Sequence, residues 1–320
     1  MGFAILDSSS LDKDKWAKLV AASEFSSFYH TLDWSLVWEK SYDFCRPLFF
    51  VEEESSEYSL GLPAVKFKKK GLVSFFSMPM GTYGGVLSQD STESETKEFL
   101  NQALDSIKSL KSLKLQLVDF KGLLSFLGRD SFRPHQTSTH IVELGKVNLD
   151  ELLTKRGYQQ AEHRNVTARR IENEAEVRRC YGLYLKTCQR HNRPPKYSER
   201  FYQNLFRAGQ NSNWLWWWVA EGEGRMVGYQ INFSFKDRLY MWDMASEPES
   251  LNLRANDYLM GQSLIWCQQH QKCSYNLGGS PKGAEGLVHF KEQWGGKEKK
   301  YYIYEKIFPL GKLVNLVRGR

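Results

Sequence analysis

The sequence predicts a mixed α/β fold with two domains that repeat one order of elements. Three observations support this prediction: a length of 320 residues, a hydrophobic content of 41% with 14% aromatic residues, and two matching successions of helices and strands. A chain of this size can bury the cores of two ordinary domains. Its longest apolar runs, such as residues 214–220, fall far short of the roughly 18 residues that a membrane span needs, so we expect no stable membrane insertion.

The first half of the chain reads as a helix, an antiparallel meander, a second helix and a strand. Trp16, Leu19 and Val20 indicate the first helix, and apolar residues three or four apart over residues 100–110 indicate the second. Short charged turns separate the apolar, β-rich runs, as is typical of a meander. The expected strands are residues 47–53, 58–67, 72–80 and 113–117.

The second half repeats that order. Helical spacing over residues 177–188 and 257–270 predicts two helices around a second meander. We expect the tryptophans of residues 214–218 to lie mainly in the core, because both faces of a central strand are usually buried. The expected strands are residues 214–220, 226–235, 238–246 and 274–278.

Domain boundaries follow from this repeat. The segment "VELGKVNLDELL" reads as a strand that passes into a new helix, so we expect an N-terminal domain at residues 1–148 and a C-terminal domain at residues 149–305. Residues 306–320 form a short basic, amphipathic segment with Leu313, Leu316, Lys312, Arg318 and Arg320. We expect this helix to dock on the N-terminal domain in preference to a membrane.

The net charge limits the class of partner, and the cysteines limit the compartment. The net charge of +7 is spread over several basic runs, which favours an anionic partner: RNA, a phosphorylated small molecule or a membrane surface. The five cysteines are odd in number and form no C-x-x-C pair, which fits a reduced cytosolic compartment without structural zinc or disulfides. The N-terminus lacks the features of a signal peptide. Because no metal-ligand cluster is evident, we expect no metal site.

The element order is that of the GNAT acyltransferase fold, and particular segments strengthen the match. The segments "TLDWSLVWEK", "GLPAVKF", "SMPMGTYGGVL", "YLKTCQRHNRPPKY", "MVGYQINF" and "YNLGGS" with "GLVHFKEQWGG" resemble, in order, the tandem-GNAT proteins of the Fem (FemABX) type. This resemblance covers nearly the whole chain. It implies two GNAT-like domains packed around a shared cleft. No sustained heptad repeat occurs, so the compact Fem type without a coiled-coil arm is the closer model.

The resemblance also implies a chemistry and a set of catalytic residues. In N-acyl transfer, an amine attacks a carbonyl carbon that is held as an ester on aminoacyl-tRNA or as a thioester on coenzyme A. Phe290 and Lys291 match the pair that family members place at the active cleft. An ammonium in a partly desolvated cleft would stabilise the negative charge that develops on the carbonyl oxygen. The alternative is a surface lysine on a short helix.

Four further residues are expected to bind substrate. Arg190 matches the arginine of a T-x-x-R motif that binds substrate phosphate in such enzymes. In GNAT-type sites a backbone N–H on the fourth strand usually donates to the oxyanion, and the resemblance places this donor near Asp243. We expect Tyr240 to line the cleft. Tyr83, between glycines in "MGTYGG", is expected to be exposed in an acceptor pocket, and the alternative is a plain turn that requires positive φ.

The donor is expected at the start of the helix near residue 257. Coenzyme A enzymes of this fold usually carry a glycine-containing loop there, whose N–H groups hold the pyrophosphate. The corresponding "SLNLRANDYL" has no glycine, which weakens coenzyme A as the donor. We assign Arg254 and Asn256 to donor binding, together with Arg164 of the basic stretch "HRNVTARR", which could meet a tRNA acceptor stem.

Three functions follow as hypotheses, none with a bound cofactor. The first is amino-acid transfer from aminoacyl-tRNA to a cell-envelope precursor, such as that of peptidoglycan, or to another amine-bearing metabolite, in the cytoplasm or at the inner membrane face. The second is N-acyl transfer from acyl-coenzyme A or acyl-carrier protein in polysaccharide or natural-product biosynthesis. The third is a non-catalytic protein that binds RNA or an envelope partner. The oligomeric state stays open.

Overall fold

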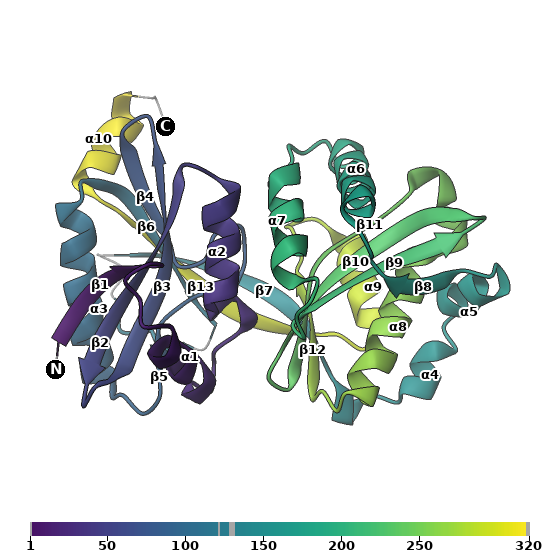
Figure 1. Ribbon diagram of the computed structural model, residues 1–320, viewed down its shortest axis with the longest axis horizontal. Helices are drawn as coiled ribbons and strands as arrows, with labels where there is room; N and C mark the ends of the chain where they lie inside the picture. Colours follow the sequence, from purple (N-terminus) through teal and green to yellow (C-terminus); the bar gives the residue numbers. More distant parts are fainter. Residues whose placement is uncertain (1, 121, 128–131, 318–320) are drawn as a thin grey trace. The chain divides into compact units, whose positions relative to one another are not determined.

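The computed structural model describes residues 2–120, 122–127 and 132–317, so Arg318 and Arg320 lie outside the described residues. The chain forms two compact units. Unit 1 consists of Met1–Thr137 with Lys300–Arg320, and unit 2 consists of Ser138–Lys299. Each unit has a mixed sheet with helices on both faces, as Figure 1 shows for the two ribbons separately. The predicted mixed α/β class is confirmed.

The sheet of unit 1 contains the predicted meander. β2, β3 and β4 pair antiparallel, β6 joins β4 in parallel, and β1 adds to β2 at the opposite edge. Its strands, in spatial order, are β1 (Gly2–Asp7), β2 (Cys45–Glu54), β3 (Glu57–Lys69), β4 (Leu72–Phe76), β6 (Ser112–Asp119) and the last part of β13 (Lys297–Ile307). The short β5 (Leu87–Ser88) pairs with β3.

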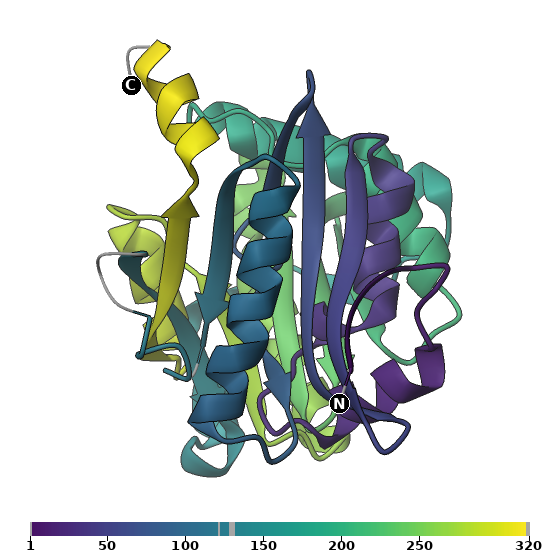
Figure 2. The same ribbon diagram turned by 90° about the vertical axis from the view of Figure 1, so that its left-hand side faces the viewer.

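Helices cover both faces of this sheet. α1 (Lys13–Ala22) and α2 (Leu32–Ser41) pack on one face, and α3 (Glu93–Ser109) lies across the other, in front of the sheet in Figure 2. The alternation of side chains explains the double coverage, because Phe49 contacts Trp16 of α1 whereas the neighbouring Phe50 belongs to the core beneath α3. A capping box of Thr92 and Glu95 begins α3.

The sheet of unit 2 repeats the arrangement. β8, β9, β10 and β11 pair antiparallel, β12 joins β11 in parallel, and β7 pairs antiparallel with β12. The strands are β7 (Arg133–Glu143), β12 (Ser274–Gly279), β11 (Arg238–Ser246), β10 (Arg225–Phe235), β9 (Leu215–Gly222) and β8 (Thr167–Arg170). Every strand that the sequence predicts in this half is present.

Helices again cover both faces of the unit 2 sheet, and the tryptophans of β9 contact both layers. Trp217 packs against Tyr202 on one side, and Trp216 packs against Trp266 on the other, with ring centroids 5.9 and 4.4 Å apart. The first layer is α6 (Glu174–Arg190) and α7 (Glu199–Gly209). The second is α8 (Ala255–Gln269) with α4 (Leu149–Leu153) and α5 (Arg156–His163). A shorter helix, α9 (Glu285–Gln293), follows β12.

The units divide the chain at 137/138 and 299/300, whereas the sequence analysis expects boundaries at 148/149 and 305/306. Strand pairing causes the difference. Val142 of β7 pairs with Tyr275 in unit 2, and Tyr304 of β13 pairs with Leu117 in unit 1. Each half of the sequence therefore contributes its last strand to the sheet of the other unit. The final helix, α10 (Pro309–Val317), lies against β6 in unit 1. Within the described residues, no helix combines the length and apolarity needed to cross a bilayer.

We expect Gly61→Ala to destabilise unit 1. A Cβ atom at Gly61 would lie 2.7 Å from both Trp16 and Leu19 of α1, too close for contacts between carbon atoms. Overpacking of this kind usually costs about 1–3 kcal/mol. Gly182→Ala, inside α6 with no atom within 4 Å of the new methyl group, is the control and should be neutral or stabilising. Urea unfolding followed by circular dichroism measures both, and equal behaviour of the two variants would contradict the packing described here.

Candidate active site in unit 2

The sheet of unit 2 opens between β11 and β12. These parallel strands pair from Arg238–Ser274 only as far as Tyr240–Asn276. β11 continues to Ser246 along β10, so among the described strands residues 241–246 have a paired neighbour on one side only. Backbone N–H and C=O groups along the open edge are therefore available to hydrogen-bond a substrate.

A β-bulge in β11 lies at this opening. The pairing changes from Ile231–Asp243 to Asn232–Met241, so Trp242 is an extra residue on β11. As a result, Trp242 and Asp243 both contact the α6–α7 layer. The ring of Trp242 packs on Tyr197 at 4.8 Å, and the Asp243 carboxylate accepts hydrogen bonds from Tyr202 at 2.5 Å and from Tyr229. Burial raises the pKa of Asp243, although both tyrosine hydroxyls favour the ionised form.

The loop between α6 and α7 brings positive charge to this face. It begins after Arg190, whose side chain is exposed at the end of α6. Tyr184 anchors the loop, because its hydroxyl accepts a hydrogen bond of 2.6 Å from the backbone N–H of Lys196. Arg193 lies close enough to Asp243 for its charge to favour the carboxylate. The predicted phosphate-binding Arg190 therefore belongs to a loop with a second arginine near the bulge.

The side chain of Lys291 hydrogen-bonds the turn at the end of β12. Its ammonium donates to the carbonyls of Gly278 and Gly279, at 2.7 and 2.9 Å, and to Ser280 Oγ at 3.2 Å. Gly278 has a φ of +73°, and its N–H donates to Asn276 Oδ1 at 2.9 Å. The turn of the "NLGGS" segment thus directs its carbonyl oxygens at one buried cation.

The environment of Lys291 differs from both expectations. The side chain is 1% exposed, neither partly open to a cleft nor on the surface, and burial lowers its pKa to about 8. All three of its N–H donors are engaged within the protein. The neighbouring Phe290 is half-buried against the core on the α8 side. The catalytic role of both residues stays a prediction, and Lys291 holds the turn in place in this structure.

His140 of β7 is a neighbour that the sequence analysis did not identify. It is 2% exposed, and neither ring nitrogen has a hydrogen-bond partner among the described residues. Burial and the charge of Lys291 lower its pKa. The next residue back, Thr139, donates to Asn276 at 2.7 Å. No spacing distinguishes His140 from the other histidines, because strand pairing alone brings β7 beside β12.

The "WGG" segment connects α9 to α8. Gly295 and Gly296 end α9 with N–H bonds of 2.9 Å to Glu292 and Lys291, the pattern of a Schellman motif, and Gly295 has a φ of +80°. Trp294 is buried, and its side chain lies close enough to the carboxyl group of Asp257, in the first turn of α8, to act against the rise of that group's pKa. The motif therefore fixes both the helix that carries Lys291 and the start of the expected donor helix.

The three predicted donor residues gather at the start of α8. Arg164 donates to the carbonyl of Asn252, two residues before Arg254, which is exposed and adopts a left-handed conformation with φ +59°. Asn256 is half-buried, and its Oδ1 has no hydrogen-bond partner within the described part of the chain. Asp257 adds a carboxyl group whose pKa is raised by burial.

Two predicted substrate residues are buried. Tyr240 lies in the core, and burial raises its pKa to about 12. Tyr83, in unit 1, is 5% exposed and packs among Tyr29, Phe120 and Tyr301, with ring centroids 4.9–5.6 Å away. The expectation that Tyr83 is exposed is wrong, because its aromatic neighbours enclose the ring. The shared cleft stays a prediction. No group of three or more potential metal ligands occurs in the described residues.

Comparison with known proteins identifies the fold. Residues 154–292 match the acetyltransferase (GNAT) domain. The chain is similar to the crystal structure of FemX, with a TM-score of 0.74 at 13% identity over 100% of both chains. A tandem GNAT protein from the clavulanic acid biosynthesis pathway matches with a TM-score of 0.60 at 9% identity, over 96% of this chain and 98% of that one.

A third match is the C-terminal domain of a putative lysylphosphatidylglycerol synthetase from Agrobacterium fabrum, with a TM-score of 0.60 at 12% identity over 96% of both chains. A sequence search of the curated proteins found no match. At these identities, the structural likeness establishes the fold.

Replacing Lys291 by Met should destabilise the protein at neutral pH, because the Gly278 and Gly279 carbonyls lose their donor; an unsatisfied buried group costs about 1–3 kcal/mol. The pH dependence tests the burial itself. Between the folded pKa of about 8 and the ordinary value of 10.5, the unfolded chain holds a proton that the folded chain releases. Wild-type stability should therefore rise with pH across this window, by about 1.4 kcal/mol per unit.

Unfolding of wild type and Lys291→Met in urea at pH 7 and pH 10 measures this difference. The difference in unfolding free energy between wild type and Lys291→Met should be larger at pH 10 than at pH 7. An equal difference in unfolding free energy at both pH values would mean that the Lys291 ammonium is solvated.

His140→Leu should be neutral or slightly stabilising at pH 7, because the imidazole nitrogens have no partner to lose among the described residues. Since the folded pKa lies below the ordinary 6.5, the unfolded chain binds the proton first as the pH falls. The wild type should thus lose stability below about pH 6.5 relative to the variant. Thermal melts from pH 7.5 to 5 check this, with the exposed His289→Leu as control. Parallel pH profiles of wild type and His140→Leu would count against a buried neutral ring.

Proposed function

We propose that this chain, an acyltransferase with the FemABX-like tandem GNAT fold, transfers the aminoacyl group of a charged tRNA to an amine-bearing acceptor. The new bond joins the amine nitrogen to the carbonyl carbon, and the ester bond to the tRNA hydroxyl breaks. The acceptor is a cell-envelope precursor, such as that of peptidoglycan, or a metabolite with an amine. We place the reaction in the cytoplasm, where charged tRNA is made.

The residues at the start of α8 support this choice of donor. Pyrophosphate binding at a helix N-terminus needs free N–H groups and close backbone approach. Residues 250–259 contain no glycine, and Asp257 adds a carboxyl group to the first turn of α8. Both features oppose a coenzyme A pyrophosphate. The exposed arginines, Arg164 and Arg254, instead suit the phosphates of a larger nucleic acid donor.

The open edge of β11 suits the chemistry of acyl transfer. Attack on the ester builds negative charge on the carbonyl oxygen, and backbone N–H groups along residues 241–246 can donate to it. The Asp243 side chain is half-buried and its carboxylate accepts hydrogen bonds from Tyr202 and Tyr229, so its part is to hold the bulge. Lys291 fixes the opposite side of the opening by holding the end of β12.

Arg190 and Arg193 suit an acceptor that carries phosphate. Arg190 is exposed at the end of α6, and Arg193 follows on the loop that Tyr184 anchors. A guanidinium binds phosphate through paired N–H groups. We therefore propose a phosphorylated acceptor, as envelope precursors commonly are.

Acyl transfer from coenzyme A is the second candidate. The tandem GNAT protein of the clavulanic acid pathway has the same fold, and its solved structure is the form without AcCoA, which relates that protein to an acyl-coenzyme A donor. In this case the acyl thioester would replace the aminoacyl ester, and the rest of the reaction at the amine would be unchanged.

A donor assay distinguishes the two candidates. The protein is incubated with charged tRNA and with acyl-coenzyme A pools, and mass spectrometry shows which donor is discharged. We expect discharge of aminoacyl-tRNA. Arg254→Gln and Arg164→Gln should weaken tRNA binding and lower its salt dependence, since each removes a phosphate contact. Arg178→Gln, exposed on α6 at the opposite face of the sheet, is the control. Micromolar affinity for coenzyme A in calorimetry, with no tRNA discharge, would favour the second candidate.

A further inference from the structure

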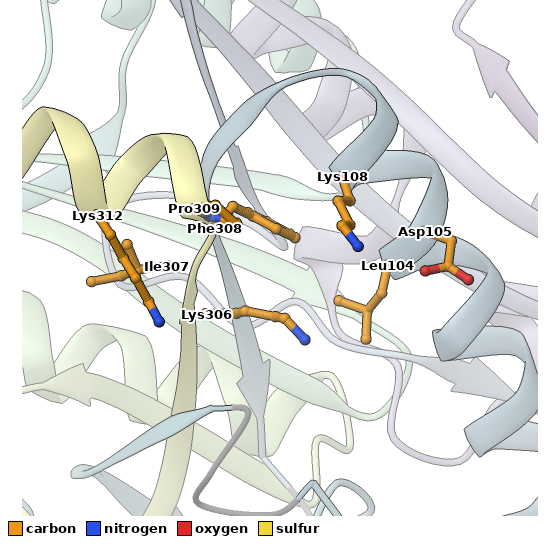
Figure 3. Close-up of a pocket in the computed structure, with 8 residues that line it drawn as sticks. All are labelled: Leu104, Asp105, Lys108, Lys306, Ile307, Phe308, Pro309 and Lys312. Atoms are coloured by element: carbon orange, nitrogen blue, oxygen red, sulfur yellow. The ribbon is translucent and has the colours of Figure 1, made fainter.

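A pocket in unit 1 has no part in the proposed transfer reaction. It lies between α3, β13 and α10 and has a volume of about 320 Å³, the size of a small ligand site. Lys108, Lys306 and Lys312 contribute its polar lining, with Leu104 and Phe308 among its apolar residues. Figure 3 shows the amino groups of Lys108 and Lys306 extending into the space between the helix α3 and the strand β13.

Positive charge dominates this pocket. Among the described residues that line it, Lys108 and Lys306 extend toward the same space beside one carboxylate, that of Asp105, whereas the amino group of Lys312 points away from the other two in Figure 3. Lys306 is half-buried, and burial together with the nearby charge of Lys108 lowers its pKa. The Lys306 amino group lies 5.0 Å from the centre of the Phe132 ring, and Asp105 offsets part of the positive charge. An added anion would further relieve the repulsion between the amino groups of Lys108 and Lys306. The pocket is therefore complementary to a compact anion such as a phosphate.

Helix α10 adds an apolar surface beside the pocket. Gly311 allows α10 to pack directly against β6, because any larger residue would place a Cβ atom 2.2 Å from the carbonyl oxygen of Leu113. Leu313 and Leu316 point away from this contact and are 58% and 77% exposed. These two leucines are three residues apart and are therefore neighbours on the helix surface. Lys312, which lines the pocket, is four residues before Leu316 and so lies beside it.

We propose that this part of unit 1 binds an anionic lipid surface, with a lipid phosphate in the lysine-lined pocket and Leu313 and Leu316 inserted among the acyl chains. The combination of features favours a lipid. A free phosphate or an RNA backbone would use the lysines but leaves two exposed leucines unexplained, whereas a membrane with anionic lipids engages both. Interfacial helices bind through this pairing of buried apolar side chains with basic residues at the headgroups.

Co-sedimentation of the full chain with vesicles tests the proposal. We expect binding to phosphatidylcholine vesicles that contain phosphatidylglycerol, little binding to pure phosphatidylcholine, and weakening by salt. Lys108→Gln and Lys306→Gln should each weaken binding about fivefold, the effect of one basic residue near an anionic surface. Leu313→Ser and Leu316→Ser should weaken it at all salt concentrations. Lys97→Gln, exposed on α3 but outside the pocket, should bind like the wild type.

Competition separates lipid from other anions. Glycerol 3-phosphate at millimolar concentration should displace the protein from vesicles only partly, because it lacks acyl chains. The proposal is overturned if vesicles do not bind while glycerol 3-phosphate or tRNA binds through Lys108 and Lys306. It is equally overturned if the leucine variants, folded by circular dichroism, bind vesicles as the wild type does. Transfer to a soluble acceptor should be unchanged in all these variants, so failure here leaves the proposed transferase activity untouched.

Discussion

The buried ammonium of Lys291 is the interaction on which the candidate site depends. It satisfies two carbonyls and a hydroxyl at the end of β12, where the strand leaves its neighbour β11. An isolated buried charge is costly, and the site contains it only because each N–H donor has a partner. The helix that carries Lys291, α9, ends about one turn later at Gly295 and Gly296, and Trp294 at that end lies close to Asp257 of α8. One lysine thus links the opening in the sheet to the start of the expected donor helix.

Periodicity explains how much of the fold the sequence could predict. Each meander strand and the principal helix after it are amphipathic or wholly apolar over their own length, so local pattern suffices to find them. α7 is a helix that the sequence analysis does not predict, although it buries one face through Phe201, Tyr202, Leu205 and Phe206. The exchange of β7 and β13 between the two sheets does not follow from the sequence, because their partners lie over a hundred residues away and no local rule selects one sheet edge over another.

The residues of the candidate site also differ in how far local sequence pattern could place them. Arg254 and Asn256 lie together because they begin one helix, which the sequence could locate, whereas Arg164 reaches the same place from the end of α5. Burial was harder to predict than position. Tyr83 and Tyr240 are enclosed by side chains from distant segments, and Lys291 is identified by its motif but not by its surroundings. His140 gives no sequence signal at all, since only the pairing of β7 with β12 brings it beside Lys291.

The strand exchange has a consequence for how the chain is made. The edge of β6 in unit 1 receives its partner from residues 302–307, which a ribosome synthesises only after the whole of unit 2. At ordinary rates of 5–20 residues per second, the stretch between β6 and β13 takes on the order of ten to thirty seconds to produce. Throughout that interval the nascent first unit carries an open, apolar strand edge of the kind that invites wrong pairing. Completion of the first unit therefore waits for the second, and a chaperone that shields β6 during translation would act at the step where the protein is most exposed to misassembly.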